Sequence, residues 1–149
     1  MVQLPFLISA DMKQAESQED DVSIEGMRIL LAEDNELNME IAEFLLTNAG
    51  AEIIKASNGK EAVEAFAKSG VGEINVILMD IMMPVMDGLE AARQIREMNR
   101  PDAKFIPIVA MSANAFQDDV ERSIKAGMNK HISKPLTGES VIKEIKSLL

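Results

Sequence analysis

The chain has 149 residues, enough for one domain with a substantial core, and it contains no cysteine, which excludes disulfides and thiolate metal sites. Asp and Glu outnumber Lys and Arg by 25 to 15, and the resulting net charge of -10 argues against direct binding to nucleic acids or anionic membranes. The apolar runs are too short to cross a bilayer, so a reducing cytoplasm is the expected location.

Residues 1–26 are predicted to form an acidic, mobile linker. They contain six acidic residues and one lysine, which is half of the net charge of the chain. The short apolar run "MVQLPFLISA" lacks the basic start of a signal peptide. Such a polar stretch buries too little apolar surface to offset its ordering entropy, so we expect the folded domain to span 27–149.

Five apolar runs alternate with segments of helical periodicity along the rest of the chain. The runs cover 27–32, 51–56, 74–80, 105–112 and 128–133. This alternation is typical of βα units, and it predicts an α/β fold in which helices cover both faces of a parallel sheet. On such sheets, ligands bind at the edge formed by the carboxyl ends of the strands.

Polar residues that can cap a helix precede each helical segment, and apolar stripes follow them. The expected N-caps are Asn35, Asn58, Asp87, Asn114 and Thr137, with Glu61 and Glu90 placed as in a capping box. In the first helix the predicted buried stripe is Leu37, Ile41, Phe44, Leu45 and Ala49; in the last it is Val141, Ile142, Ile145 and Leu149.

The run "VILMDIMMPVMDG" ends its apolar stretch on a single carboxylate, Asp80. A buried ionised group needs partners, and other strand ends offer them. Strand one is followed by Glu33 and Asp34, strand four ends at Ser112, and strand five precedes Lys134. Three crowded carboxylates require a cation, and Mg²⁺ suits an all-oxygen site that also binds phosphate.

Each of these residues also has a purely structural interpretation. Asp80 could cap a helix, although Pro84 disfavours helix directly before it. Ser112 alone is typical of a turn, Lys134 alone of a solvated surface, and the lone His131 of a packed strand residue. The functional interpretation therefore depends on the set rather than on any one member.

The segments "RILLAEDN", "VILMDIMMPVMDGLEAARQIR", "PIVAMSA" and "AGMNKHISKPL" together resemble the receiver domain of response regulators, the CheY-like family, most closely the receivers of hybrid histidine kinases. The match runs from about Met27 to Leu149. The resemblance implies a flavodoxin-like, doubly wound (βα)5 fold with strand order 2-1-3-4-5, and it implies Mg²⁺ or Mn²⁺ as cofactor.

The resemblance also assigns roles to individual residues. Asp80 is similar to the phosphoacceptor, and Glu33 and Asp34 to the acidic pair that holds the metal together with the backbone carbonyl of Met82. Lys134 matches the lysine that contacts the phosphoryl group, followed by Pro135 after an expected cis bond. Ser112 matches the switch hydroxyl. His131 stands where the family has Tyr or Phe, which puts the usual aromatic switch in doubt.

The expected function is therefore a receiver that takes a phosphoryl group from a histidine kinase or a histidine-phosphotransfer protein and switches the face formed by the fourth helix, fifth strand and fifth helix. The alternative is a pseudo-receiver that acts only as an interaction module. A flavodoxin-like cofactor binder is disfavoured because "AEDNELN" after strand one is acidic and repels phosphate. Whether the chain counts as an enzyme, whether it stands alone or belongs to a hybrid kinase, and its oligomeric state are left open.

Overall fold

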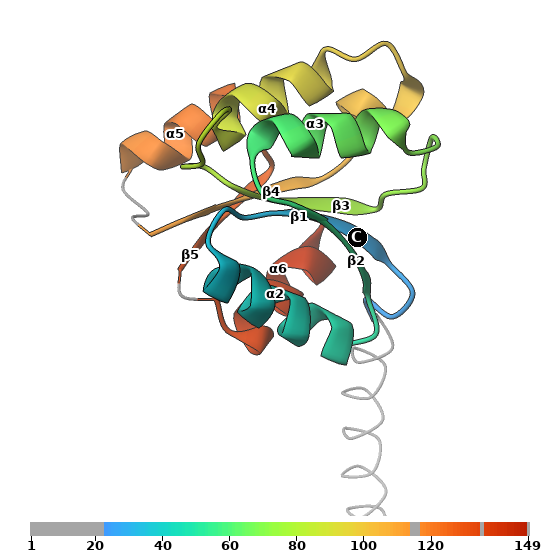
Figure 1. The fold of residues 1–149 in the computed structure, drawn as a ribbon, viewed down its shortest axis with the longest axis vertical. Helices are drawn as coiled ribbons and strands as arrows, with labels where there is room; N and C mark the ends of the chain where they lie inside the picture. Colours follow the sequence, from blue (N-terminus) through green and yellow to red (C-terminus); the bar gives the residue numbers. More distant parts are fainter. Residues whose placement is uncertain (1–22, 114–116, 135, 149) are drawn as a thin grey trace, which may run out of the picture.

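The computed structural model describes residues 23–113, 117–134 and 136–148, and these form a five-stranded parallel sheet between two layers of helices (Figure 1). The strands are β1 (Arg28–Ala32), β2 (Glu52–Ala56), β3 (Val76–Asp80), β4 (Ile108–Ser112) and β5 (Lys130–Ser133), in the order β2-β1-β3-β4-β5. The predicted fold class and strand order are confirmed.

Helices cover both faces of this sheet, as expected from the alternating pattern. They are α2 (Glu36–Asn48), α3 (Gly59–Lys68), α4 (Gly88–Arg96), α5 (Gln117–Lys125) and α6 (Gly138–Ser147), with a short 3₁₀ helix η1 (Pro101–Lys104) before β4. Figure 1 shows α2 and α6 on one face and α3, α4 and α5 on the other. None of the helices in the described ranges has the length and apolar character needed to span a bilayer.

Four of the five predicted caps are confirmed. The side chains of Asn35, Asn58, Asp87 and Thr137 each accept a hydrogen bond from the first turn of α2, α3, α4 and α6; Asn114 lies outside the described residues. The two capping boxes do not form as predicted. Glu61 accepts from the amide and hydroxyl of Ser57 instead of the amide of Asn58, and Glu90 pairs with Arg93 along the helix.

The predicted buried stripe of α2 is wrong for Leu37, Ile41 and Phe44, whereas Leu45 and Ala49 are half-buried. The structure buries Ala42 and Leu46 and half-buries Met39 and Ala49, whereas Leu37, Ile41 and Phe44 are 64%, 42% and 67% exposed. Apolar residues occupy most of the circumference of this helix, so periodicity alone offers two stripes. The side with Ala42, Leu46 and Ala49 packs in the apolar cluster on the sheet, and Leu37, Ile41 and Phe44 face outward. In α6 the prediction holds for Val141 and Ile145, which are buried; Ile142 is half-buried, and Leu149 lies outside the described residues.

The folded domain also extends slightly before the predicted boundary. Ile24 is only 1% exposed and packs in the same apolar cluster as Ile29 and Leu46. The amide of Gly26 donates to the carbonyl of Gly50, which ties this segment to the loop after α2. The buried side chain of Ile24 therefore lies before the expected start of the domain at residue 27, while the assignment of 1–26 as a mobile linker stays a prediction.

Candidate functional site

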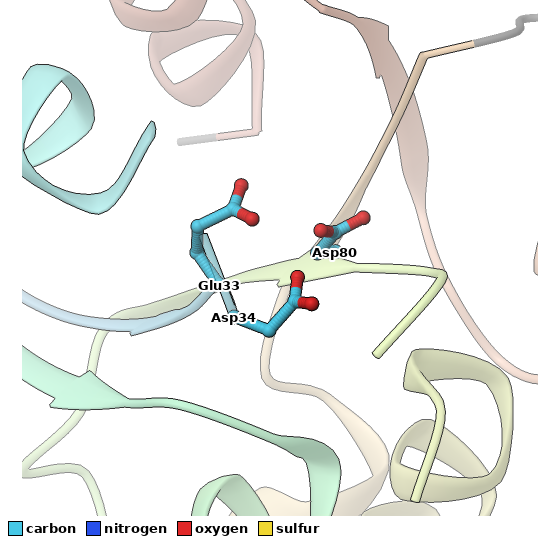
Figure 2. A group of neighbouring side chains, drawn as sticks. All are labelled: Glu33, Asp34 and Asp80. Atoms are coloured by element: carbon cyan, nitrogen blue, oxygen red, sulfur yellow. The ribbon is translucent and has the colours of Figure 1, made fainter. Parts of the chain in front are cut away.

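β1 and β3 are neighbours in the sheet, and acidic side chains stand at the carboxyl ends of both. Glu33 and Asp34 follow β1, and Asp80 is the last residue of β3. Carboxylate oxygens of the three residues lie within 4.8 Å of one another. Figure 2 shows the three side chains meeting in one space beyond the strand ends. The expected convergence of the three carboxylates is therefore confirmed. Glu33 and Asp80 are buried, and Asp34 is exposed.

Lys134 reaches the same site from the loop after β5. Its ammonium lies 2.6 Å from Glu33 Oε1 and 2.8 Å from Asp80 Oδ2. The amide of Lys134 donates to the carbonyl of Ser112, which continues the pairing of β4 with β5 and fixes the backbone position of Lys134. The side chain is only 16% exposed. Such charge-assisted contacts in a buried setting are strong, and they hold the ammonium between the two carboxylates.

Burial and crowding act on the protonation of this cluster. Burial raises the pKa of Glu33, and the neighbouring carboxylate of Asp80 raises it further, although the bond from Lys134 acts in the opposite direction. For Lys134, burial acts to lower the pKa, but the hydrogen bonds and charges of Asp80 and Glu33 outweigh it, and the net pKa is raised. Lys134 is therefore a permanent cation at neutral pH, and the site carries more negative than positive charge.

Three carboxylates against one ammonium form a cluster that can bind a divalent cation. All the donors are oxygens, and only some are engaged by the lysine, which suits a hard ion that keeps several waters. Glu33, Asp34 and Asp80 could hold Mg²⁺ in this way. The amide of Asn35 also donates to Glu33 Oε2 at 3.2 Å, which orients that carboxylate toward the cluster.

The loop between β3 and α4 brings backbone close to Asp80. A side chain at Gly88 would collide with the carbonyl oxygen of Asp80, so only glycine lets α4 begin here, and the amide of Gly88 donates to Ile81 at 2.8 Å. Val85 in this loop has φ of +69°, a strained conformation for a β-branched residue that is typical of functional loops. Met82, whose carbonyl we assigned to the metal, has a side chain that is 80% exposed.

The site opens into a cleft of about 720 Å³. Besides the three acids and Lys134, its lining includes Asn38, Met82, Ser112 and Arg122. Sequence reasoning missed Asn38 and Arg122, which lie within helices and have no local motif that marks them. Arg122 is a second cation at this cleft, contributed by α5.

Comparison with known proteins identifies the family of this chain. The family model of the response regulator receiver domain matches residues 29–146. The chain belongs to this family. It is 38% identical over 111 residues to Hybrid signal transduction histidine kinase I of Dictyostelium discoideum, covering 73% of this chain and 6% of that protein. The chain is therefore a receiver domain of two-component systems, and it spans only a small part of that relative, which is a histidine kinase.

Two solved structures are similar to this receiver domain. The receiver domain of a sensor histidine kinase from Pseudomonas aeruginosa, with magnesium coordinated in its active-site cleft, has a TM-score of 0.75 and 33% identity, covering 83% of this chain and 97% of that chain. The receiver domain of the Saccharomyces cerevisiae response regulator Ssk1, co-crystallised with the histidine phosphotransfer signaling protein Ypd1, has a TM-score of 0.73 and 28% identity, covering 84% and 90%.

Two further sequence-predicted residues of the receiver lie beside the cleft. Ser112 lines it and is 7% exposed, and its hydroxyl oxygen is hydrogen-bonded to Nε2 of His131 at 2.7 Å. The sequence placed both residues near the site but did not indicate this bond. Pro135, whose cis bond was predicted, lies outside the described residues.

An exposed apolar face borders the cleft. We call Leu37, Ile41 and Phe44 the outer α2 face; they recur at helical spacing on the solvent side of the helix. A small cavity of about 60 Å³ connects this face to the site, because Ile41 lines it together with Glu33, Asn38, Lys134 and Leu136. Apolar surface of this kind beside a reactive site indicates a protein contact.

Proposed function

We propose that this receiver domain accepts a phosphoryl group on Asp80 from a phosphohistidine, in a reaction that requires Mg²⁺ or Mn²⁺. The observation that supports it most is the position of Asp80, a buried carboxylate 2.8 Å from the Lys134 ammonium with two further carboxylates within 4.8 Å. An anionic nucleophile in an acidic pocket repels an anionic donor, so the arrangement favours transfer only when a cation joins the acids.

The transfer needs no separate base because Asp80 acts as a carboxylate. One of its oxygens forms the new bond to phosphorus while the N–P bond of the phosphohistidine breaks. The leaving imidazole nitrogen keeps that electron pair and takes a proton from water. Lys134 is positioned to neutralise charge on the phosphoryl oxygens in the loose transition state. The hydroxyl of Ser112 is positioned at the cleft to donate to one of those oxygens afterwards.

Glu33, Asp34, Asp80 and the backbone carbonyl of Met82 are the residues that would hold the metal ion. When bound, the ion supplies positive charge that converts the acidic cleft into a site for phosphate. The magnesium in the cleft of the similar Pseudomonas receiver supports this assignment.

We also propose that the phosphodonor is a histidine-phosphotransfer protein or a histidine kinase that docks on the outer α2 face. The Ssk1 receiver, which is similar in fold, was crystallised with such a protein. Three residues of the reactive cleft, Glu33, Asn38 and Lys134, also line the small cavity beneath Ile41. Glu36 and Glu40 stand on the same helix, so the fitting partner surface is apolar with a basic rim.

Intact-mass spectrometry after incubation with acetyl phosphate tests the acceptor role. The parent should gain one phosphoryl group with Mg²⁺ and none with chelator, and Asp80→Asn should fold normally and gain none. Asp87→Asn is a matched control, because Asp87 lines the same cleft and Asn also caps a helix. If the parent stays unmodified by every donor tried with Mg²⁺ present, the pseudo-receiver alternative is correct.

A further inference from the structure

His131 and Ser112 share one face of the sheet on neighbouring strands. β4 and β5 pair in parallel with Ala110 opposite His131 and Ser112 opposite Ser133. Side chains alternate along a strand, so Ala110, Ser112 and His131 point to the same side. Ala110 belongs to the apolar cluster on the α3 and α4 side, whereas Ile132, the next residue along β5, belongs to the cluster on the opposite side.

The imidazole reaches the hydroxyl along the strand direction. Ala110, directly opposite His131, has only a methyl group and is fully buried, so the ring can extend over it toward Ser112. The 2.7 Å separation between Ser112 Oγ and His131 Nε2 is that of a well-formed hydrogen bond. A Phe ring at this position cannot make this bond, so the contact depends on the imidazole of His131.

We propose that His131 is a positioning residue that holds the Ser112 hydroxyl in the unphosphorylated domain, so that Ser112 must exchange the imidazole for a phosphoryl oxygen when Asp80 is modified. This inference rests on the proposed phosphoacceptor role. A serine hydroxyl has one proton, and phosphoryl oxygens only accept hydrogen bonds. Which atom donates depends on the tautomer of His131: with the ring proton on Nδ1 the Ser112 hydroxyl donates to Nε2, and with the proton on Nε2 the ring donates to Ser112 Oγ. In both forms the bond holds Oγ at His131, and so it stabilises the unphosphorylated arrangement.

Removing the bond should favour the phosphorylated arrangement. His131→Phe keeps an aromatic ring and deletes the hydrogen bond, and the net strength of one hydrogen bond corresponds to about 2- to 10-fold in rate or population. We expect His131→Phe to be phosphorylated about 2- to 10-fold faster than the parent by acetyl phosphate with Mg²⁺. His131→Gln, whose amide can keep a bond to Ser112, should stay closer to the parent.

A double variant shows whether His131 acts through Ser112. In a Ser112→Ala background the His131→Phe substitution should have no further effect on the rate, because the hydroxyl that it releases is absent. If the acceleration persists there, or if His131→Phe is as slow as the parent or slower, the proposal is overturned. An unmodified parent would instead overturn the acceptor role itself, and this inference would fall with it.

A spectroscopic readout is independent of the stability of the Phe variant. The chain has one histidine, so the side-chain ¹⁵N signals of His131 are unambiguous. We expect the Nε2 signal to shift between the parent and Ser112→Ala without phosphodonor, and to shift in the parent on phosphorylation toward its position in Ser112→Ala. An Nε2 signal that is the same in all three samples would show that the bond does not position Ser112.

Discussion

Replacing Lys134 with methionine should destabilise the domain in the absence of divalent ions and strengthen its response to Mg²⁺. The Lys134 ammonium lies 2.6 Å from Glu33 and 2.8 Å from Asp80, and both carboxylates are buried. Methionine keeps the unbranched apolar stem and deletes the charge. The variant therefore leaves two buried carboxylates without their cation, and the change in packing is small.

The size of the effect follows from this burial. Removing one partner of a buried ion pair typically costs about 3 to 5 kcal/mol, because the remaining charge is left desolvated. Here the pKa of Glu33 is already raised by burial and by Asp80, so this carboxyl can take up a proton and limit the loss. We therefore expect a loss at the lower end, about 3 kcal/mol, which for a domain of this length lowers Tm by roughly 10 °C.

Magnesium should restore much of that loss. With the ammonium gone, a divalent ion no longer meets a positive charge between Glu33 and Asp80, so it binds the variant at least as tightly as the parent. Each tenfold gain in affinity adds about 1.4 kcal/mol of stability at saturating ion. Phosphorylation by acetyl phosphate should nevertheless be slower, because the phosphoryl oxygens lose the Lys134 charge.

Urea denaturation in chelator and in Mg²⁺ measures both effects. Lys130→Met is the matched control, since Lys130 begins β5, the strand directly before Lys134, and has an exposed side chain; it should change little in either buffer. Equal stability of parent and Lys134→Met in chelator would refute the reasoning. So would a folded Lys134→Met that no longer responds to Mg²⁺.

Three further outcomes follow from the structure. Glu33→Gln should be more stable than the parent in chelator at neutral pH, and in thermal melts it should lose most of the stabilisation by Mg²⁺. The pKa of Glu33 is raised in the folded domain, so its protonated form contributes stability at low pH, and this contribution is lost as the pH rises through the folded pKa. Gln stays neutral and avoids the cost of burying the ionised carboxylate, and a lower Tm of the variant in chelator would contradict this. Phe44→Ser should slow transfer from a phosphorylated histidine-phosphotransfer protein while leaving transfer from acetyl phosphate unchanged. Phe105→Ser, at an 81% exposed residue before β4, should affect neither, and equal slowing of Phe44→Ser with both donors would argue against docking on the outer α2 face. Ile24→Ala should cost about 3 kcal/mol in urea denaturation, because Ile24 is fully enclosed; a change below about 1 kcal/mol would show that this segment does not contribute to the core.

The sequence by itself determined the architecture and most of the acidic site. Continuous apolar runs alternating with helical segments permit little other than a parallel sheet with helices on both faces. In such a sheet every strand end reaches the same edge, so residues at the end of a strand or directly after it, such as Asp80 and Glu33, had to meet there. Local chemistry also determined four helix starts, because a capping side chain acts within its own first turn.

Where the local sequence allowed several side-chain arrangements, only the tertiary structure decided which one forms. α2 is apolar around most of its circumference, and the choice of buried stripe depended on how closely the helix could approach the sheet, which favoured Ala42 over Phe44. The burial of Ile24 depended on its packing with Ile29 of β1 and Leu46 of α2 in one apolar cluster, which no local pattern encodes. The bond between Ser112 and His131 required the register of β4 against β5 and the small side chain of Ala110, which are properties of two strands packed together and of neither one alone.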